Sequence, residues 1–305
     1  MALTETEARM LVVMNEAAGR IGSGEVAEVV AELETTGTVH VAACADEAGL
    51  NEILDRRGDR TLVVVGGDGS LHTTMKHLWW RGEADVCPVG LIPLGTGNDF
   101  ARGVGIPLDP AEAARLIASG AAARPVDLIT DDAGGVVVNA VHVGVGADAA
   151  ALARPLKRFL RSVAFPVGSA AAGIRARGWH LRIELDAVAV ASGRRRVLMA
   201  GLSNAPTIAG GTAVLGPTAS PTDGVFDLTV SLATGPLARI GYAARLVAGT
   251  HPQRADVVTA TGRTLTIAGE PFHINADGEL VGPVTRRTWT IRPGAWRCIL
   301  PPIGG

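Results

Sequence analysis

The chain has 305 residues, of which 47% are hydrophobic and 19% are charged, and its formal net charge is −2. This length suits two domains or one large domain, and the apolar fraction allows a sizeable core. A pI near 6.4 argues against a nucleic-acid-binding protein, which usually carries a basic excess. We therefore expect a globular protein that does not bind nucleic acid.

The three cysteines, Cys44, Cys87 and Cys298, lie far apart and lack the C-x-x-C spacing of zinc and redox sites. We expect buried, reduced thiols that act as small apolar side chains. The first ten residues lack the basic and apolar regions of a signal peptide. No stretch of about 20 residues is apolar enough to span a bilayer. These features favour a cytoplasmic protein.

The first part of the chain alternates between β-type and helical patterns. Repeated β–α steps predict a Rossmann-like, mostly parallel sheet with helices on both faces. Ligands of such sheets collect at the carboxyl ends of the strands. The patterns predict strands at 11–14, 39–43, 61–65, 89–93 and 124–129, and helices at 23–35, 46–57 and 110–119.

A glycine-rich turn follows the apolar run TLVVV at 61–65, and a helical pattern begins after the turn. Glycine lets the backbone approach a phosphate closely, and the free N–H groups of a helix N-terminus point toward it. A bare carboxylate would repel phosphates, so Asp68 indicates a divalent metal, a water relay or a sugar hydroxyl between them. The turn consists of Gly66, Gly67, Asp68, Gly69 and Ser70.

A second loop of the same kind follows the strand predicted at 89–93. Gly95, Thr96 and Gly97 form the turn, and Asn98 or Asp99 is the natural N-cap of the next helical turn. A single glycine turn after a buried strand is weak evidence for a phosphate site. Two such turns, each closing a β-to-α step, are harder to explain as ordinary turns.

The segment GGDGS followed by PLGTGNDFAR resembles the diacylglycerol kinase catalytic-domain family, bacterial lipid kinases related to sphingosine and ceramide kinases. The resemblance runs from Val12 to about Trp296. It implies a fold shared distantly with NAD kinases and phosphofructokinases, and two loops that bind ATP. It also implies Mg²⁺, with Asp68 and Asp99 as expected ligands. Family members often carry Asn-Pro where this chain has Asn15-Glu16, on the phosphate side of the nucleotide.

The alternation of strand and helix ends near residue 130. Several short strands with turn residues between them suggest a β-rich, antiparallel, sandwich-like second domain. We therefore expect a nucleotide-binding domain at 1–130 and a lipid-substrate domain at 131–292, with 293–305 packing back on the first. Strands are predicted at 136–143, 181–185, 195–202, 226–231, 256–260, 264–268 and 272–276, and helices at 152–177 and 236–248.

Two aspartates have both a structural and a functional interpretation. Asp127 occupies either an outward position on its strand or a site position, and the resemblance places a functional aspartate there. Asp223 lies in the segment PTASPTDG. This segment forms either a capped turn or, as in some family members, a structural magnesium site.

The segment Asn275-Ala-Asp-Gly-Glu279 contains the carboxylates best suited to catalysis. An Asp-Gly pair between two strands is a common hairpin turn. In an extended segment, however, Asp277 and Glu279 would share one face. The family uses this DGE motif for catalysis. We therefore expect Asp277 to take the proton of the lipid hydroxyl and Glu279 to hold metal or orient Asp277. A cleft between the domains would hold ATP and the lipid headgroup.

The resulting hypothesis is an ATP- and magnesium-dependent kinase that phosphorylates a lipid hydroxyl, most simply that of diacylglycerol, at the inner face of the membrane. Basic residues at 157, 158 and 161 suggest membrane contact, although a solvated helix face explains them too. Two alternatives stay open, a kinase of a soluble substrate such as NAD and a nucleotide-sensing regulator without catalysis. The sequence also leaves open whether the chain forms a homodimer.

Overall fold

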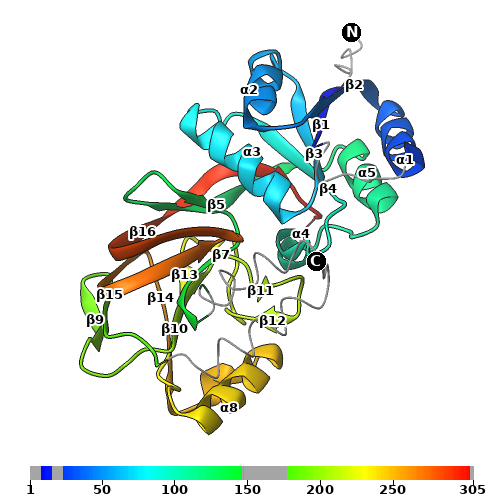
Figure 1. Cartoon of the computed structure of the whole chain (residues 1–305). Helices are drawn as coiled ribbons and strands as arrows, with labels where there is room; N and C mark the ends of the chain where they lie inside the picture. The colour runs from blue at the N-terminus through cyan, green and yellow to red at the C-terminus, as the bar shows by residue number, and fades with distance from the viewer. Residues whose placement is uncertain (1–7, 16–22, 146, 148–176, 303–305) are drawn as a thin grey trace. The chain divides into compact units, whose positions relative to one another are not determined.

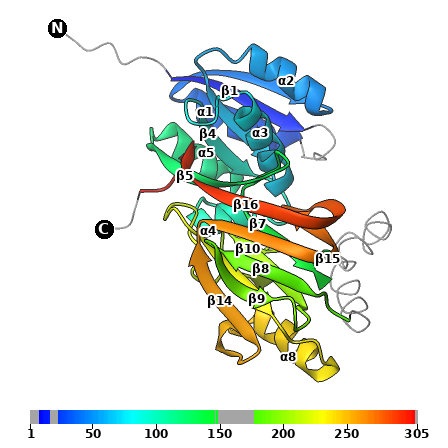
Figure 2. The same cartoon turned by 90° about the vertical axis from the view of Figure 1, so that its left-hand side faces the viewer.

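The computed structural model describes residues 8–15, 23–145, 147 and 177–302 (Figures 1 and 2). The chain divides into two compact units, Met1–Asp127 with Pro293–Gly305, and Leu128–Arg292. Two strands pass from one unit to the other, β5 (Ala123–Asp131) and β16 (Glu279–Ile299). The basic helix predicted at 152–177 lies almost entirely outside the described residues, as do the basic residues of the membrane hypothesis.

The first unit contains the predicted parallel sheet. Strand β1 pairs with β2 and β3, and β3 pairs with β4, all in parallel register. The last residues of β16 extend the sheet in parallel beside β4. The mostly parallel α/β fold is thus confirmed. These strands are β1 (Ala8–Asn15), β2 (Gly37–Cys44), β3 (Thr61–Gly66) and β4 (Pro88–Pro93).

Helices cover both faces of this sheet. Helix α1 packs against α5, and α2 packs against α3, so the two pairs lie on opposite faces (Figure 1). Asp46 and Asp109 accept hydrogen bonds from the first turns of α2 and α5, which fixes where these helices begin. The helices are α1 (Ser23–Glu34), α2 (Glu47–Asp55), α3 (Asp68–Trp80), α4 (Asp99–Val104) and α5 (Pro110–Ala118).

The second unit is built mainly from antiparallel strands, as predicted. Its pairings run β14–β13–β10–β7–β15–β16, with β8 and β9 beyond β15 and β6 beside β5. The strands are β6 (Val136–Val137), β7 (Ala140–Gly144), β8 (Leu181–Leu185), β9 (Val188–Ser192), β10 (Met199–Ser203), β11 (Thr207–Ile208), β12 (Ala213–Val214), β13 (Phe226–Ser231), β14 (Val257–Gly262) and β15 (Thr264–Ala276).

The predicted strands at 264–268 and 272–276 are a single strand, β15. Its pairing with β16 shifts register between Ala268 and Phe272, so Gly269 and its neighbours form an irregularity within the strand. The sequence pattern shows a turn-like Gly-Glu-Pro there, which explains why two strands were predicted. The pairing partner β16 was not predicted, because its residues do not alternate regularly between apolar and polar.

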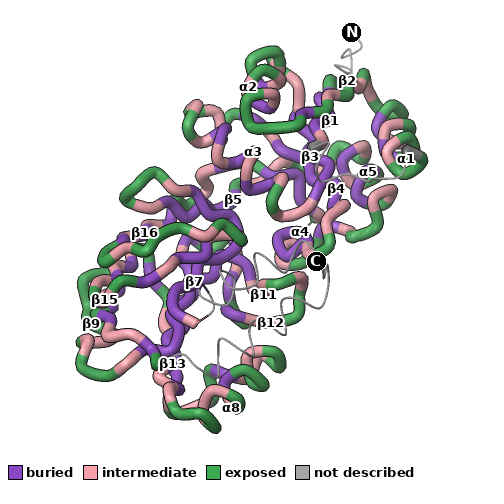
Figure 3. The backbone as a smooth tube through the Cα atoms, viewed as in Figure 1, coloured by how far each residue is buried: buried purple, intermediate pink, exposed green. Residues whose placement is uncertain are grey.

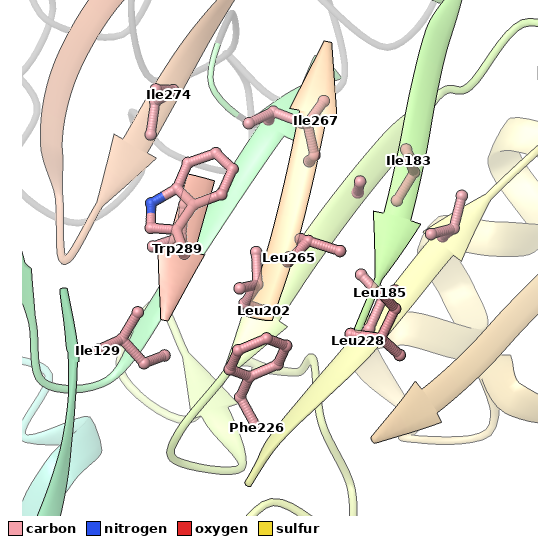
Figure 4. Close-up of a cluster of buried hydrophobic side chains, with 14 of the residues drawn as sticks. Ile129, Ile183, Leu185, Leu202, Phe226, Leu228, Leu265, Ile267, Ile274 and Trp289 are labelled. Atoms are coloured by element: carbon pink, nitrogen blue, oxygen red, sulfur yellow. The ribbon is translucent and has the colours of Figure 1, made fainter. Parts of the chain in front are cut away.

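Large apolar side chains fill the core of the second unit. Trp289, Phe226 and Phe272 are almost fully buried among aliphatic residues of β8, β10 and β15. Figure 4 shows Trp289 and Phe226 among several of these residues. Outside this core lie helix α8 (Pro236–Val247) and the short 3-10 helix η2 (His251–Gln253). Close packing of aromatic and branched side chains supplies most of the driving force for folding such a unit.

All three cysteines are buried and none forms a disulfide, as predicted from their spacing. Burial raises the pKa of the thiols of Cys87 and Cys298. Their side chains therefore serve packing and not thiolate chemistry. In the part of the chain that the structure describes, no helix combines the length and the apolar character needed to cross a membrane.

Candidate functional site

The two glycine loops lie side by side at the carboxyl ends of β3 and β4. The backbone N–H of Leu94 donates to the carbonyl oxygen of Gly66 at 2.9 Å. A Cβ atom built on Gly67 would lie 2.8 Å from Cα of Gly95, closer than real Cβ contacts come. The backbones therefore touch where only glycine fits. The sequence predicted both loops, and the structure brings them together.

Asn98 shapes the second loop from within. It has a left-handed backbone conformation with φ of 55° and precedes the first residue of α4. Its side chain does not cap that helix as expected. Its Oδ1 accepts from the N–H of Gly95 at 3.1 Å, and its Nδ2 donates to the carbonyl oxygen of Gly95 at 2.9 Å. The loop is thus closed on itself and presents a fixed backbone.

Asp68 links the first loop to the second. Its Oδ2 accepts from the N–H of Asp99 and its Oδ1 from the N–H of Phe100, both at 3.0 Å. The carboxylate therefore supplies the missing cap of α4, and the negative charge suits the positive end of a helix. A role as a helix cap was not among those considered from the sequence, because the donors belong to residues 31 and 32 positions away.

The N-terminus of α3 differs from that of α4, because no side chain of the described residues caps it. The helix begins at Asp68, three positions before the predicted start, and Gly67 is its N-cap without a side-chain hydrogen bond. Gly69 in the first turn is exposed, and a Cβ built there would meet nothing within 4 Å. Thirteen residues of aligned peptide dipoles end at this open turn. The first turn of α3 is accordingly the best anion site of the two loops.

A cavity of about 200 Å³ adjoins this turn. It lies at the carboxyl ends of β1, β2 and β3, and Ser70 of the first loop contributes to its wall. Typical small-molecule sites occupy roughly 300–1,000 Å³, so this smaller cavity has room for no more than part of a nucleotide. Cys44 and Asp46 also line it, and neither was expected there from the sequence. Their position just after a parallel strand was the available signal.

The remaining loop residues lie at the same strand ends. Thr96 is exposed, and the carbonyl oxygen of Gly97 accepts from Nε of Arg102 at 3.2 Å. Asn15 is the last residue of β1 and pairs with Cys44 of β2. Parallel pairing therefore places Asn15 at the edge where both glycine loops begin.

Asp127 lies within β5 and is buried, with 3% of its surface exposed. Its Oδ1 accepts from the N–H of Gly294 at 2.7 Å, and its carbonyl oxygen accepts from the indole N–H of Trp296 at 3.2 Å. Asp127 thus holds the returning C-terminal segment on the first unit. This contact gives the residue a structural role in addition to the functional role expected from the resemblance.

In the second unit, Asp277 and Gly278 form the two-residue turn between β15 and β16. Both have positive φ, 47° and 91°, as a type I′ hairpin requires. Because Asp277 is in the turn, it does not lie with Glu279 on one face of an extended strand, as the sequence analysis expected. Glu279 opens β16, pairs with Ala276, and is exposed.

The carboxylate of Asp277 is held by backbone donors from the first residue of β7 and the two residues before it. Its Oδ2 accepts from the N–H of Val138 at 2.6 Å, and its Oδ1 accepts from the N–H groups of Asn139 and Ala140 at 3.0 Å. These donors occupy at least three of the roughly four acceptor positions of a carboxylate. At most about one acceptor position of this carboxylate is therefore left for a substrate proton.

The expected magnesium ligands are divided between the two units. Asp68 and Asp99 belong to the first unit, and Asp223 belongs to the second, where its Oδ1 accepts from the N–H of Val225 in a turn. Both oxygens of Asp68 already accept backbone hydrogen bonds. Among the described residues, no three His, Cys, Asp or Glu side chains are grouped to hold a metal. These residues therefore do not fit a metal site made of protein ligands alone.

Burial raises the pKa of Asp227, near Asp223, and the Asp223 charge adds to this effect. Thr218 donates its hydroxyl to Asp227 at 2.6 Å. The segment around Asp223 is thus a capped turn that leads into β13, which was one of its two interpretations.

Both units match known family models. Residues 9–130 match the diacylglycerol kinase catalytic domain, and residues 139–300 match the YegS C-terminal NAD kinase beta sandwich-like domain. The chain is 32% identical over 297 residues to the Pseudomonas aeruginosa protein named "Probable lipid kinase YegS-like", covering 92% of this chain and 91% of that protein. The chain belongs to the YegS-like lipid kinase family.

Other members and structures agree with this assignment. A diacylglycerol kinase of Bacillus subtilis is 28% identical over 290 residues, with 90% of each chain covered. A diacylglycerol kinase structure from Bacillus anthracis has a TM-score of 0.72 at 19% identity, covering 96% of this chain and 97% of that chain. An NAD kinase from Archaeoglobus fulgidus in complex with ATP has a TM-score of 0.53 at 15% identity, covering 95% and 93%. Both structures show the fold that this lipid kinase family shares with NAD kinases.

Proposed function

We propose that this kinase transfers the γ-phosphate of ATP to a lipid hydroxyl, most simply that of diacylglycerol, and forms phosphatidic acid. The observation that supports this most is the contact of the two glycine loops beside the uncapped first turn of α3. Backbone N–H groups and a helix N-terminus at one sheet edge suit a triphosphate. Membership in the YegS-like lipid kinases supports a lipid acceptor.

The nucleotide enters this proposal as its magnesium complex. Magnesium in kinase sites uses phosphate oxygens and water together with one or two carboxylates, so a cage of protein ligands is unnecessary. Positioning and charge neutralisation supply most of the catalysis in phosphoryl transfer. The first turn of α3 and the backbone of the second loop would bind and orient the phosphates.

The acceptor hydroxyl needs a base, and we assign this role to Asp277. The lipid oxygen forms a bond to the γ-phosphorus, the bond from that phosphorus to the bridging oxygen of ADP breaks, and the hydroxyl proton passes to Asp277. Glu279 would orient Asp277 or bind magnesium. Asp127, in the first unit, would have the functional role that the family resemblance implies. We further propose that the kinase meets its lipid at the inner face of the membrane.

A parallel substrate screen tests the proposal. Purified protein is incubated with γ-labelled ATP and magnesium, and diacylglycerol, sphingosine, phosphatidylglycerol and NAD are offered separately. We expect label in the diacylglycerol product and its loss when a chelator removes magnesium. Label in another lipid would show that this lipid, and not diacylglycerol, is the acceptor.

The two alternative functions give different results in the same screen. Label in NAD with none in any lipid would replace the lipid kinase with a kinase of a soluble substrate. ATP binding without label in any acceptor would favour a nucleotide-sensing regulator.

A further inference from the structure

Helix α8 of the second unit presents two different apolar faces. Its inner face carries Ala238, Tyr242 and Leu246, which pack on the buried cluster formed with Leu215 and Val257. Residues four apart lie on the same side of a helix, so this face explains why α8 docks on its unit. The inner face needs no further partner.

The outer face of α8 is also apolar, although it lies in solvent. Leu237 is 85% exposed, Ile240 65% and Val247 64%. Ala243 and Ala244 between them are exposed as well. Figure 3 shows exposed residues along α8. By the helical period of 3.6 residues, these positions lie opposite Tyr242 and form one stripe along the helix. Single exposed apolar residues are ordinary, but an aligned stripe marks an interaction surface.

Basic residues border this stripe on both sides. The helical period places Arg239 on one flank and Arg245 on the other. Arg254 lies near Gly241 on the same flank as Arg245, and its guanidinium binds Asp256 in two hydrogen bonds of 2.7 Å. From Ser231 to Ala255 the sequence has three arginines and no acidic residue, in a chain whose net charge is −2.

We propose that the outer face of α8 docks this kinase on an anionic lipid membrane. An interfacial helix buries apolar side chains at the level of the lipid headgroups, while flanking arginines reach the phosphates. The positive border matches a negatively charged surface and would not be needed for an apolar protein partner. The proposal deepens the proposed function and rests on it, because a kinase of membrane lipids has to reach its substrate at the bilayer surface.

Vesicle binding of the intact chain tests the surface directly. Co-sedimentation is measured with vesicles of phosphatidylcholine alone and of phosphatidylcholine mixed with phosphatidylglycerol. We expect binding to the mixed vesicles and a loss of at least about tenfold in the double variant Leu237→Ser/Ile240→Ser, because both side chains leave water on binding. The variant Arg239→Gln/Arg245→Gln should weaken binding by about fivefold or more per arginine in the mixed vesicles.

A matched control comes from the same unit. Val188 on β9 is 68% exposed but lies outside α8, so Val188→Ser should bind the vesicles as the wild-type protein does. Urea unfolding of Leu237→Ser/Ile240→Ser and of Val188→Ser should give unchanged midpoints, since these three side chains are exposed. Equal vesicle binding of wild-type and Leu237→Ser/Ile240→Ser proteins would overturn the proposal.

Light scattering and two substrate forms complete the test. A fall in molecular mass of Leu237→Ser/Ile240→Ser with unchanged vesicle binding would make the face a contact between two copies and overturn membrane docking. We expect this variant to lose turnover on diacylglycerol in vesicles and to keep it on a short-chain diacylglycerol dissolved in water. Absence of turnover on every lipid would reject the proposed function, whereas the vesicle-binding comparison would still decide the docking surface.

Discussion

Gly67 and Gly95 lie so close together that neither has room for a side chain. A Cβ on Gly67 would come within 2.8 Å of Cα of Gly95. A flexible side chain could rotate to relieve such a clash, but backbone atoms cannot. Because each glycine opens its own loop, this contact determines how the two halves of the expected triphosphate site are spaced.

Replacing Gly67 with alanine should therefore damage both the fold and ATP binding. Overpacking of this kind costs about 1–3 kcal/mol, which urea unfolding will measure, and calorimetry will measure the loss of ATP affinity. Gly24 in α1 is the matched control, because a Cβ there meets nothing within 4 Å. Stability of Gly67→Ala equal to that of Gly24→Ala would contradict the contact.

Gly69→Ala separates phosphate binding from folding. The residue is in the first turn of α3, where alanine is a better helix former than glycine by up to about 1 kcal/mol, so stability should hold or rise. A methyl group over that turn should obstruct a bound phosphate and weaken ATP binding. Unchanged ATP affinity would place the phosphates elsewhere than on the first turn of α3.

Asp68→Asn should loosen the second loop. The amide group that replaces one carboxylate oxygen would face a backbone N–H of α4 and lose a charge-assisted hydrogen bond, at a cost of about 2 kcal/mol. Asp109→Asn is the control, because Asp109 caps α5 outside the cavity and asparagine caps a helix about as well as aspartate. We expect a lower urea midpoint and weaker ATP binding for Asp68→Asn, and near wild-type values for Asp109→Asn.

Asp277→Asn should lower turnover by about 10²-fold or more if the residue is the general base. It should also lower stability, because the amide NH₂ of asparagine cannot accept the hydrogen bond that a backbone N–H donates to the carboxylate. Turnover is therefore expressed per folded molecule, measured beside circular dichroism and urea unfolding. A folded Asp277→Asn protein with near-normal turnover would show that Asp277 is not the general base. Its role would then be limited to stabilising the hairpin.

Glu279→Gln provides the comparison on the same hairpin. Glu279 is exposed, so its replacement should change stability by no more than about 0.5 kcal/mol. We expect turnover to fall with the fold intact, as for a residue that orients Asp277 or binds magnesium. Wild-type turnover at every magnesium concentration would remove Glu279 from the mechanism.

Buried His142 should make the protein less stable in acid. Burial lowers the pKa of this imidazole to about 4 from an ordinary value of 6.5. In the unfolded chain this imidazole takes up a proton below pH about 6.5, whereas in the folded chain it does so only below pH about 4. The free energy of unfolding therefore falls as the pH drops through this window. The full effect is about 3 kcal/mol, since each pKa unit corresponds to about 1.4 kcal/mol.

Urea unfolding between pH 7 and pH 4 measures this effect. His142→Gln should reduce the loss of stability, and exposed His40→Gln should leave it unchanged. His251 is also buried with a lowered pKa, so part of the loss will persist in His142→Gln. Identical pH profiles for wild-type and His142→Gln proteins would contradict the burial of a neutral imidazole.

The sequence by itself determined the fold class, both glycine loops and the family. These depend on local patterns, since a run such as TLVVV followed by glycines specifies a buried strand and its turn within a few residues. The hairpin turn at Asp277 could also be predicted from the sequence, because Asp-Gly readily adopts positive φ at two successive positions.

The tertiary structure decided what the polar groups of those motifs bind. Asp68 caps a helix 31 residues away, Asp127 holds Gly294, and Asp277 accepts from the backbone before β7. No local pattern encodes these hydrogen bonds, because each donor comes from a segment that only folding brings near. The exposed stripe of α8 follows the same logic, since helical spacing marks two apolar faces and only packing decides which one is buried.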